Sequence, residues 1–194
     1  MKKTTIDTIK SVLVLTIISF VCVGLLAVCN EFLKYTPTLD KEMASWLYQV
    51  CPTGEASDEN ALDYFEILNI EDQIKSVNSA NKSTGGKVLA VYRAKSGVNA
   101  GRYIVQAQAS GRDGDIIMLT AFDSENKISK AVCYSQSESF WFKVNEDWFD
   151  NLIGKEDEVT SDDIQASSGA TMSLTAVAKA VTISCAMVNE ITGA

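Results

Sequence analysis

The most prominent hydrophobic feature of the sequence is an apolar run near the N-terminus. Residues 11–30 carry no charged side chain and are rich in Val, Leu and Ile. Twenty helical residues extend about 30 Å, the thickness of the hydrocarbon core of a bilayer. Lys2, Lys3 and Lys10 precede the run, against Asp7 alone. The pattern predicts one uncleaved transmembrane helix in the cell membrane, with a cytoplasmic N-terminus and the remaining chain on the outer face.

After this run the pattern is helical but interrupted. Apolar residues share one helical face between Leu39 and Val50, and residues 51–54, Cys-Pro-Thr-Gly, break that pattern. Residues 61–65 predict a short second helix, and the polar residues 71–86 predict a loop. The sequence thus divides into a cytoplasmic tip and anchor (1–34), a helical lead-in with a polar loop (35–86) and a third part (87–194).

The third part begins with a series of strand patterns. They cover residues 87–94, 103–109, 116–119 and 128–134. The second alternates apolar and polar side chains and predicts a half-buried strand, whereas the third is continuously apolar and predicts burial on both faces. The short connections favour antiparallel neighbours. With residues 141–152 and 171–188 at helical spacing, the pattern predicts an α+β fold in which helices pack on an antiparallel sheet.

Composition excludes several function classes. The net charge is −8, and residues 1–34 carry four lysines and two acids, so the remainder carries −10. A basic patch with interleaved aromatic residues is missing, which argues against nucleic acid as a partner. The absence of histidine removes Ser-His-Asp catalysis and histidine metal sites, and none of the five cysteines forms a C-x-x-C pair. We expect no metal site and no independent catalytic site. A disulfide among Cys51, Cys133 and Cys185 stays open.

A polar turn precedes the last helical pattern. Residues 167–173 read Ser-Ser-Gly-Ala-Thr-Met-Ser, and apolar residues recur at helical spacing from Thr171 onward. A helix N-terminus favours anions, because its first N–H groups lack partners and its dipole is positive there. The Thr171 hydroxyl is therefore either a simple N-cap, which contributes about 1 kcal/mol, or an attachment point for phosphate.

Residues at three places resemble a known family. The segment 168–171 resembles the S-G-A-T motif of FMN-binding domains in which the flavin phosphate is esterified to the threonine. Residues 111–116, Gly-Arg-Asp-Gly-Asp-Ile, resemble the family's G-x-x-G-x-I turn, and Glu138-Ser139 stands where the family has E-T. The order and spacing over nearly the whole chain are similar to those of the G subunit of the Rnf ion-translocating electron-transport complex.

This resemblance implies a membrane-anchored flavoprotein that relays electrons through covalent FMN, within a complex that passes electrons between ferredoxin and NAD and moves sodium or protons. The implied partners are the other membrane and peripheral subunits and a flavin transferase. The implied cofactor-binding residues are Thr171, which carries the FMN phosphoryl group, with Ser168, Gly169, Ala170, Glu138 and Ser139. Two alternatives stay open: the C subunit of the sodium-pumping NADH:quinone reductase, which shares the motif, and a membrane-anchored binding or sensor domain without flavin.

The chain departs from the family pattern at two places. Phe140-Trp141-Phe142 replaces the family's P-G-x-G, and Gln165 stands where the family commonly has Asp. Trp141 and Phe142 are candidates for contact with the flavin ring, and each is also a candidate core residue. Glu138 is either a flavin-site residue or a solvated loop acid. Arg102 and Arg112 are either surface charges or groups that stabilise reduced flavin.

Overall fold

A computed structural model describes residues 12–26, 38–54, 61–165 and 170–193. The chain divides into two compact units, Met1–Thr36 and Pro37–Ala194. In the first unit the structure describes the helix Val12–Leu26, whose side chains are exposed.

The long apolar helix lies at a different position from the one that the sequence analysis predicts. Among the described residues, only α6 (Thr171–Thr192) is long and apolar enough to cross a membrane, and 67% of its apolar window is buried inside the protein. Such burial is typical of the core helix of a globular domain. Of the expected N-terminal span, residues 11–30, the structure describes Val12–Leu26 as an apolar helix, and residues 11 and 27–30 lie outside the described residues.

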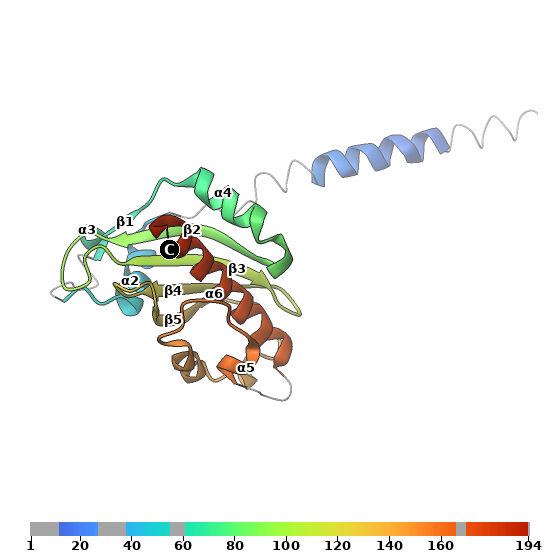
Figure 1. The fold of residues 1–194 in the computed structure, drawn as a ribbon. Coiled ribbons are helices and arrows are strands. Elements are labelled where there is room, and N and C mark those ends of the chain that lie inside the picture. Colours follow the sequence, from blue (N-terminus) through green and yellow to red (C-terminus); the bar gives the residue numbers. More distant parts are fainter. Residues whose placement is uncertain (1–11, 27–37, 55–60, 166–169, 194) are drawn as a thin grey trace, which may run out of the picture. The chain divides into compact units, whose positions relative to one another are not determined.

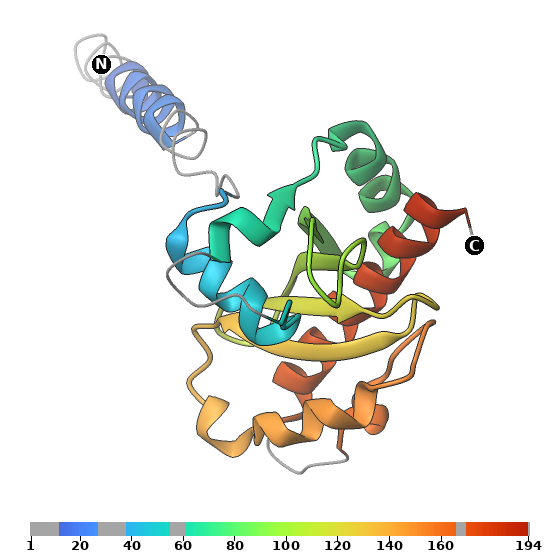
Figure 2. The same cartoon turned by 90° about the vertical axis from the view of Figure 1, so that its left-hand side faces the viewer.

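The second unit contains one antiparallel sheet with the strand order β1-β2-β3-β4-β5. Figures 1 and 2 show α6 crossing one face of the sheet and α2 (Lys41–Val50) covering the other. This confirms the predicted α+β fold, in which helices pack on an antiparallel sheet. The strands are β1 (Phe65–Ile67), β2 (Gly86–Ala94), β3 (Tyr103–Ser110), β4 (Asp115–Phe122) and β5 (Ile128–Ser135).

Helices on both faces bury β3 more deeply than its alternating pattern predicts. Val105, Ala107 and Ala109 belong to the core beneath α6, and Ile104 belongs to the core beneath α2. Gln106 is fully buried, and its Oε1 lies 3.2 Å from the Tyr92 hydroxyl, which donates a hydrogen bond to it. The prediction of a half-buried strand was wrong because the second helical layer is a long-range feature.

The segment predicted as a loop contains a helix, α4 (Glu71–Ala80). Glu71 and Asp72 stand in its first turn, where the helix dipole favours acids. Val77 is buried, and the Asn78 side chain accepts from the backbone N–H of Val88 and donates to its carbonyl, at 2.8 and 3.0 Å. Val77, with Ile74 packed beside it against the core, and the backbone of β2 therefore stabilise a helix whose sequence is otherwise mostly polar.

Three shorter segments complete the lead-in. Residues predicted as a second short helix form α3 (Ala61–Tyr64), which continues directly into β1. The turn after α4 is a 3₁₀ helix, η1 (Lys82–Thr84). The strand β1 pairs with the C-terminal half of β2, so the lead-in contributes one edge of the sheet.

The segment after β5 contains 3₁₀ helices, η2 (Trp141–Lys143) and η3 (Glu146–Leu152), rather than the longer helix that the apolar spacing predicts. Phe149 and Leu152 are nevertheless buried. A short helix, α5 (Ser161–Ile164), follows with a capping box between Thr160 and Asp163. These elements lie below the sheet in Figure 1 and lead the chain to the start of α6.

Candidate functional site

The threonine of the S-G-A-T motif is the first residue of α6, and its side chain is exposed. The N-cap position belongs to Ala170, which is buried and has no side-chain hydrogen-bonding group. Thr171 therefore does not occupy the capping position that the simpler interpretation requires. Its carbonyl accepts a hydrogen bond from the Thr175 hydroxyl at 2.7 Å. Ser168 and Gly169 lie outside the described residues.

Glu138 joins this helix start to the Gly111–Gly114 turn. Its Oε1 accepts from the backbone N–H groups of Asp113 and Gly114, at 2.8 and 3.2 Å. Its Oε2 accepts from the Ser173 hydroxyl at 2.6 Å. Glu138 is 6% exposed and Ser173 is 3% exposed. We call Glu138, the Gly111–Gly114 turn and Ser173 the carboxylate clamp.

The two glycines of the turn leave the room that the clamp needs. A Cβ atom at position 111 would overlap the Glu138 carboxylate, and a Cβ atom at position 114 would overlap the Ser137 hydroxyl. The G-x-x-G pattern thus allows the backbone of the turn to approach the segment that follows β5. Its N–H groups can then reach a buried carboxylate.

The electrostatics of the clamp favour an ionised Glu138. Burial by itself raises the pKa of this carboxyl. The hydrogen bonds from Ser173 and from backbone N–H groups of the turn outweigh that effect, and the pKa lies below its usual value. Glu138 is therefore a buried, hydrogen-bonded anion, and the interpretation as a solvated loop acid was wrong.

Ser139 makes a second link between the segment after β5 and the Gly111–Gly114 turn. Its backbone N–H donates to Asp113 Oδ2 at 3.0 Å, and this bond lowers the pKa of Asp113. The side chain of Ser139 is exposed. The Glu138-Ser139 pair thus holds the turn through both a side chain and a backbone group.

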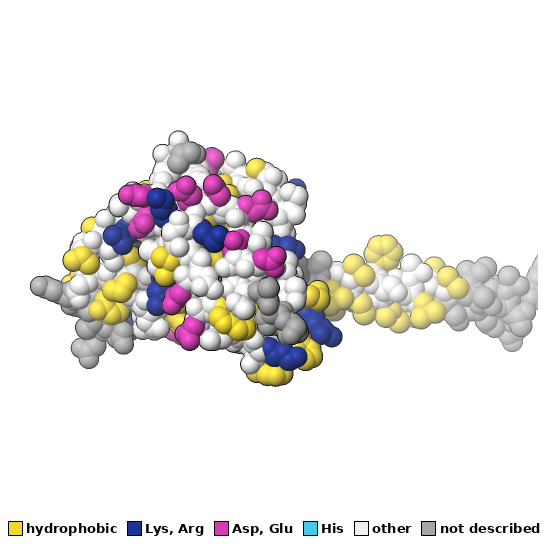
Figure 3. Space-filling view, turned by 60° about the horizontal axis from the view of Figure 1, so that its bottom comes forward, with side chains coloured by type: hydrophobic (Ala, Val, Ile, Leu, Met, Phe, Trp, Pro, Cys, Tyr) yellow, Lys and Arg dark blue, Asp and Glu magenta, His cyan; other side chains and the backbone are white. Residues whose placement is uncertain are grey.

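An exposed surface of aromatic and basic side chains adjoins the clamp. The Arg112 guanidinium lies 5.0 Å from the centroid of the Phe140 ring, and Lys143 Nζ lies 5.2 Å from the same centroid. The Phe140 and Phe142 centroids are 6.1 Å apart, and Phe142 is 77% exposed. We call these four residues the aromatic rim. Figure 3 shows hydrophobic and basic side chains together at one edge of a face that otherwise carries many acids.

Two other residues that the sequence suggests as flavin contacts, Trp141 and Arg102, are not part of this surface. Trp141 is half-buried, packs on Phe149 and donates its indole N–H to Glu146 at 3.1 Å, so it is a core residue. Arg102 follows the β2–β3 turn, and its charge acts on Cys51, a residue of the core beneath α2. Of the two arginines, only Arg112 lies beside the clamp.

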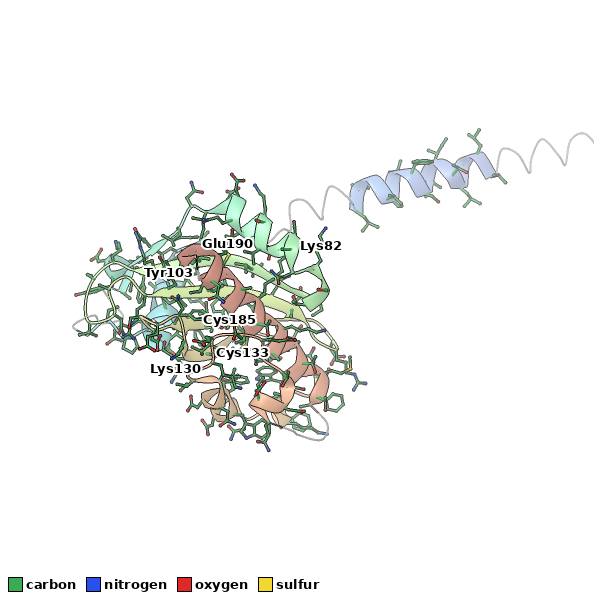
Figure 4. All side chains as sticks on the ribbon, in the orientation of Figure 1. Lys82, Tyr103, Lys130, Cys133, Cys185 and Glu190 are labelled. Carbon is green, nitrogen blue, oxygen red and sulfur yellow. The ribbon has the colours of Figure 1, made fainter. Side chains whose placement is uncertain are left out.

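The cysteines do not form the disulfide that the sequence left open. Cys51, Cys133 and Cys185 are all free and buried. Cys133 on β5 and Cys185 on α6 share the core beneath α6 (Figure 4), whereas Cys51 lies in the core on the other side of the sheet. Burial raises the pKa of the Cys133 and Cys185 thiols to about 12, so both behave as small core residues.

The segment before the motif is held by Asp163. Its carboxylate accepts from Lys155 Nζ at 2.6 Å and from the backbone N–H and hydroxyl of Thr160, at 2.8 and 2.7 Å. These bonds lower its pKa to about 2, with the Lys155 bond as the largest cause. Gln165, the departure from the family pattern, is exposed and follows α5 directly.

One residue of the site was not assigned a role from the sequence. Ser173 stands on the buried face of α6, beside Leu174 and Val177. A serine among apolar positions of one helical face is a signal for a buried polar partner. The sequence cannot identify that partner, because Glu138 lies 35 residues away along the chain.

Comparison with family models gives one match. Residues 111–185 match the FMN-binding domain. The matched segment begins at the first glycine of the turn and includes the whole clamp, the rim and Thr171. It supports FMN as the cofactor and a redox or electron-transfer role for the protein. A comparison with curated proteins finds no match to this chain.

Proposed function

We propose that the FMN-binding domain carries its flavin covalently, through a phosphoester to the Thr171 hydroxyl. The observation that supports this most directly is the exposed Thr171 side chain at the first position of a 22-residue helix, within the segment that matches the FMN-binding domain. Flavin mononucleotide supplies the capacity to accept and release electrons. The protein supplies attachment, orientation and electrostatics.

The residues around Thr171 suit such a group. The start of α6 offers backbone N–H groups and the positive end of a helix dipole to a phosphodiester, typically worth 0.3–1 kcal/mol. The aromatic rim offers the exposed ring of Phe142 and the partly buried ring of Phe140, with Arg112 and Lys143 within cation–π distance of Phe140. Two cationic side chains beside a flat aromatic surface suit a ring that becomes negatively charged on reduction. Ser168 and Gly169 would flank the attachment point.

The attachment step needs an activated donor, because joining free FMN to a hydroxyl would require loss of water. In our proposal a flavin transferase uses a flavin dinucleotide. The Thr171 oxygen forms a bond to the phosphorus of the FMN half, and the bond from that phosphorus to the bridging oxygen breaks. The nucleoside monophosphate leaves with the bridging oxygen, and the hydroxyl proton passes to a base of the transferase.

In the cell, we propose, the protein relays electrons as the G-type subunit of an Rnf-like ion-translocating ferredoxin:NAD oxidoreductase. The support is the order of the sequence motifs together with the apolar, exposed helix Val12–Leu26, which would anchor the chain with its N-terminus in the cytoplasm. Ion transport would belong to other subunits. Gentle detergent extraction should recover a multisubunit complex, and protease added to intact spheroplasts should remove the flavin domain. Recovery as a free monomer, or protection of the domain until lysis, would refute this part.

The test of attachment is mass spectrometry of the full-length protein made in cells that contain a flavin transferase. We expect an FMN adduct on the peptide that contains Thr171, and colour that survives denaturation. The Thr171→Ala variant should be folded and colourless. Thr175→Ala, which alters a hydroxyl one turn further along α6, should keep the adduct. Native protein without an adduct would reject the proposal and favour a domain that binds FMN without a covalent bond or carries no flavin. An adduct that persists in Thr171→Ala would also reject it, because the flavin would then be attached at another residue.

A further inference from the structure

Both carboxylate oxygens of Glu138 accept hydrogen bonds from other parts of the domain. One oxygen binds two backbone N–H groups of the Gly111–Gly114 turn, and the other binds the Ser173 hydroxyl. At 6% exposure, the residue has little surface left for a ligand. A direct contact with the cofactor, which the sequence resemblance implies, therefore does not suit its position.

The Ser173 end of the clamp lies within the first turn of α6. First turns fray easily, because their N–H groups have no partners within the helix. Here Ala170 at the N-cap position has no side-chain group to hold them. The bond between Ser173 and Glu138 ties this turn to the sheet side of the domain, two residues after Thr171. A short hydrogen bond to a buried charge is among the stronger ones in proteins.

We infer that Glu138 is a positioning residue for flavin attachment: through Ser173 it holds the first turn of α6 so that the Thr171 hydroxyl is presented in one orientation. This inference rests on the proposed attachment at Thr171. The clamp also joins the helix start to the turn that carries Arg112, and so links the attachment point to the aromatic rim. Small displacements of a reacting group can cost up to about a hundredfold in rate, which is why orientation matters for the transfer.

The test compares initial rates of flavin transfer to full-length protein by a purified flavin transferase with a flavin dinucleotide. The variants are Glu138→Ala, Glu138→Gln and Ser173→Ala. The controls are Glu125→Gln, in the β4–β5 turn, and Ser184→Ala, which removes a buried hydroxyl of α6 bonded within the helix to the Ala180 carbonyl. All are assayed at a temperature at which thermal unfolding curves show that each variant is folded.

We expect kcat to fall about tenfold or more for Glu138→Ala and Ser173→Ala, with the KM for the protein substrate within about twofold of wild type. The kcat of Glu138→Gln should fall less than that of Glu138→Ala, because the glutamine amide oxygen still accepts from the turn and the amide N–H can donate to Ser173. The two control variants should have the same kcat and KM as wild type. A purely stabilising role would leave kcat of the folded variants unchanged.

The outcomes separate the two proposals. A wild-type protein that acquires no adduct at Thr171 refutes the proposed attachment and this inference with it. A wild-type protein that is modified at Thr171, with folded Ser173→Ala modified at the same kcat, refutes only the role of the clamp. If Glu138→Ala fails to fold, the decision rests on Ser173→Ala, which removes a single hydroxyl.

Discussion

Adding one methyl group at Gly111 should break the carboxylate clamp while leaving every hydrogen-bonding group of the clamp in the chain. A Cβ atom at this position would overlap Oε1 of Glu138. Gly111 is not among the described residues with a left-handed φ angle, so alanine has no backbone penalty there. The effect of Gly111→Ala therefore reports on the contact with Glu138 alone.

The size of the effect follows from the bonds that Glu138 would lose. Displacing its carboxylate disturbs two backbone N–H bonds, at 2.8 and 3.2 Å, and the 2.6 Å bond from Ser173, all in a residue that is 6% exposed. Hydrogen bonds to charged groups contribute about 1.5–3 kcal/mol each, and the side chain can partly relax toward water. We expect the free energy of unfolding to fall by about 3 kcal/mol, with a drop in Tm of roughly 6–12 °C for a domain of this size.

A double-mutant cycle isolates the contact. In Glu138→Ala the carboxylate that the new methyl group would meet is gone, so adding Gly111→Ala should cost less than about 0.5 kcal/mol more. The coupling energy is then about 2–3 kcal/mol. The measurement is urea denaturation of full-length protein in a mild detergent, followed by tryptophan fluorescence. Additive effects of the two substitutions, or a Gly111→Ala variant as stable as wild type, would refute the account of the clamp.

Two further predictions concern other parts of the domain. The pKa of Asp163 is lowered to about 2, so its ion pair with Lys155 stabilises the fold above the unfolded pKa and loses that contribution as pH falls from about 4 to 2. Asp163→Asn should cost about 1 kcal/mol near pH 7 and much less near pH 2, measured by urea denaturation across that range, and a cost independent of pH would contradict this. Gly97 and Gly101 both have left-handed φ angles, of +83° and +85°, but only a Cβ at Gly97 would overlap a neighbour, the Thr53 carbonyl. Gly97→Ala should therefore lower Tm by several degrees more than Gly101→Ala, and equal losses would show that the overlap relaxes freely.

Several features of this protein follow from its sequence alone, because they depend on near neighbours in the chain. Helical spacing of apolar residues from Leu174 to Val188 indicates α6, and the apolar runs and turn residues indicate β2 to β5 in antiparallel order. The four-residue motif at 168–171 and the G-x-x-G turn point to the FMN-binding domain that the family comparison finds. Each of these signals is contained in a short window of sequence.

Other features depend on contacts between distant residues, and only the tertiary structure decided them. The helix α4 depends on its packing against the core and on a bond between Asn78 and the backbone of β2, and the deep burial of the middle of β3 depends on α2, which packs on its second face. The site shows the same limit. Glu138 lies 25 residues from Asp113 and 35 residues from Ser173, and no local pattern encodes which donors surround a carboxylate. The sequence identifies Glu138 as a residue of interest, but its burial and its role as a link between the turn and α6 come from the packing of the sheet against the last helix.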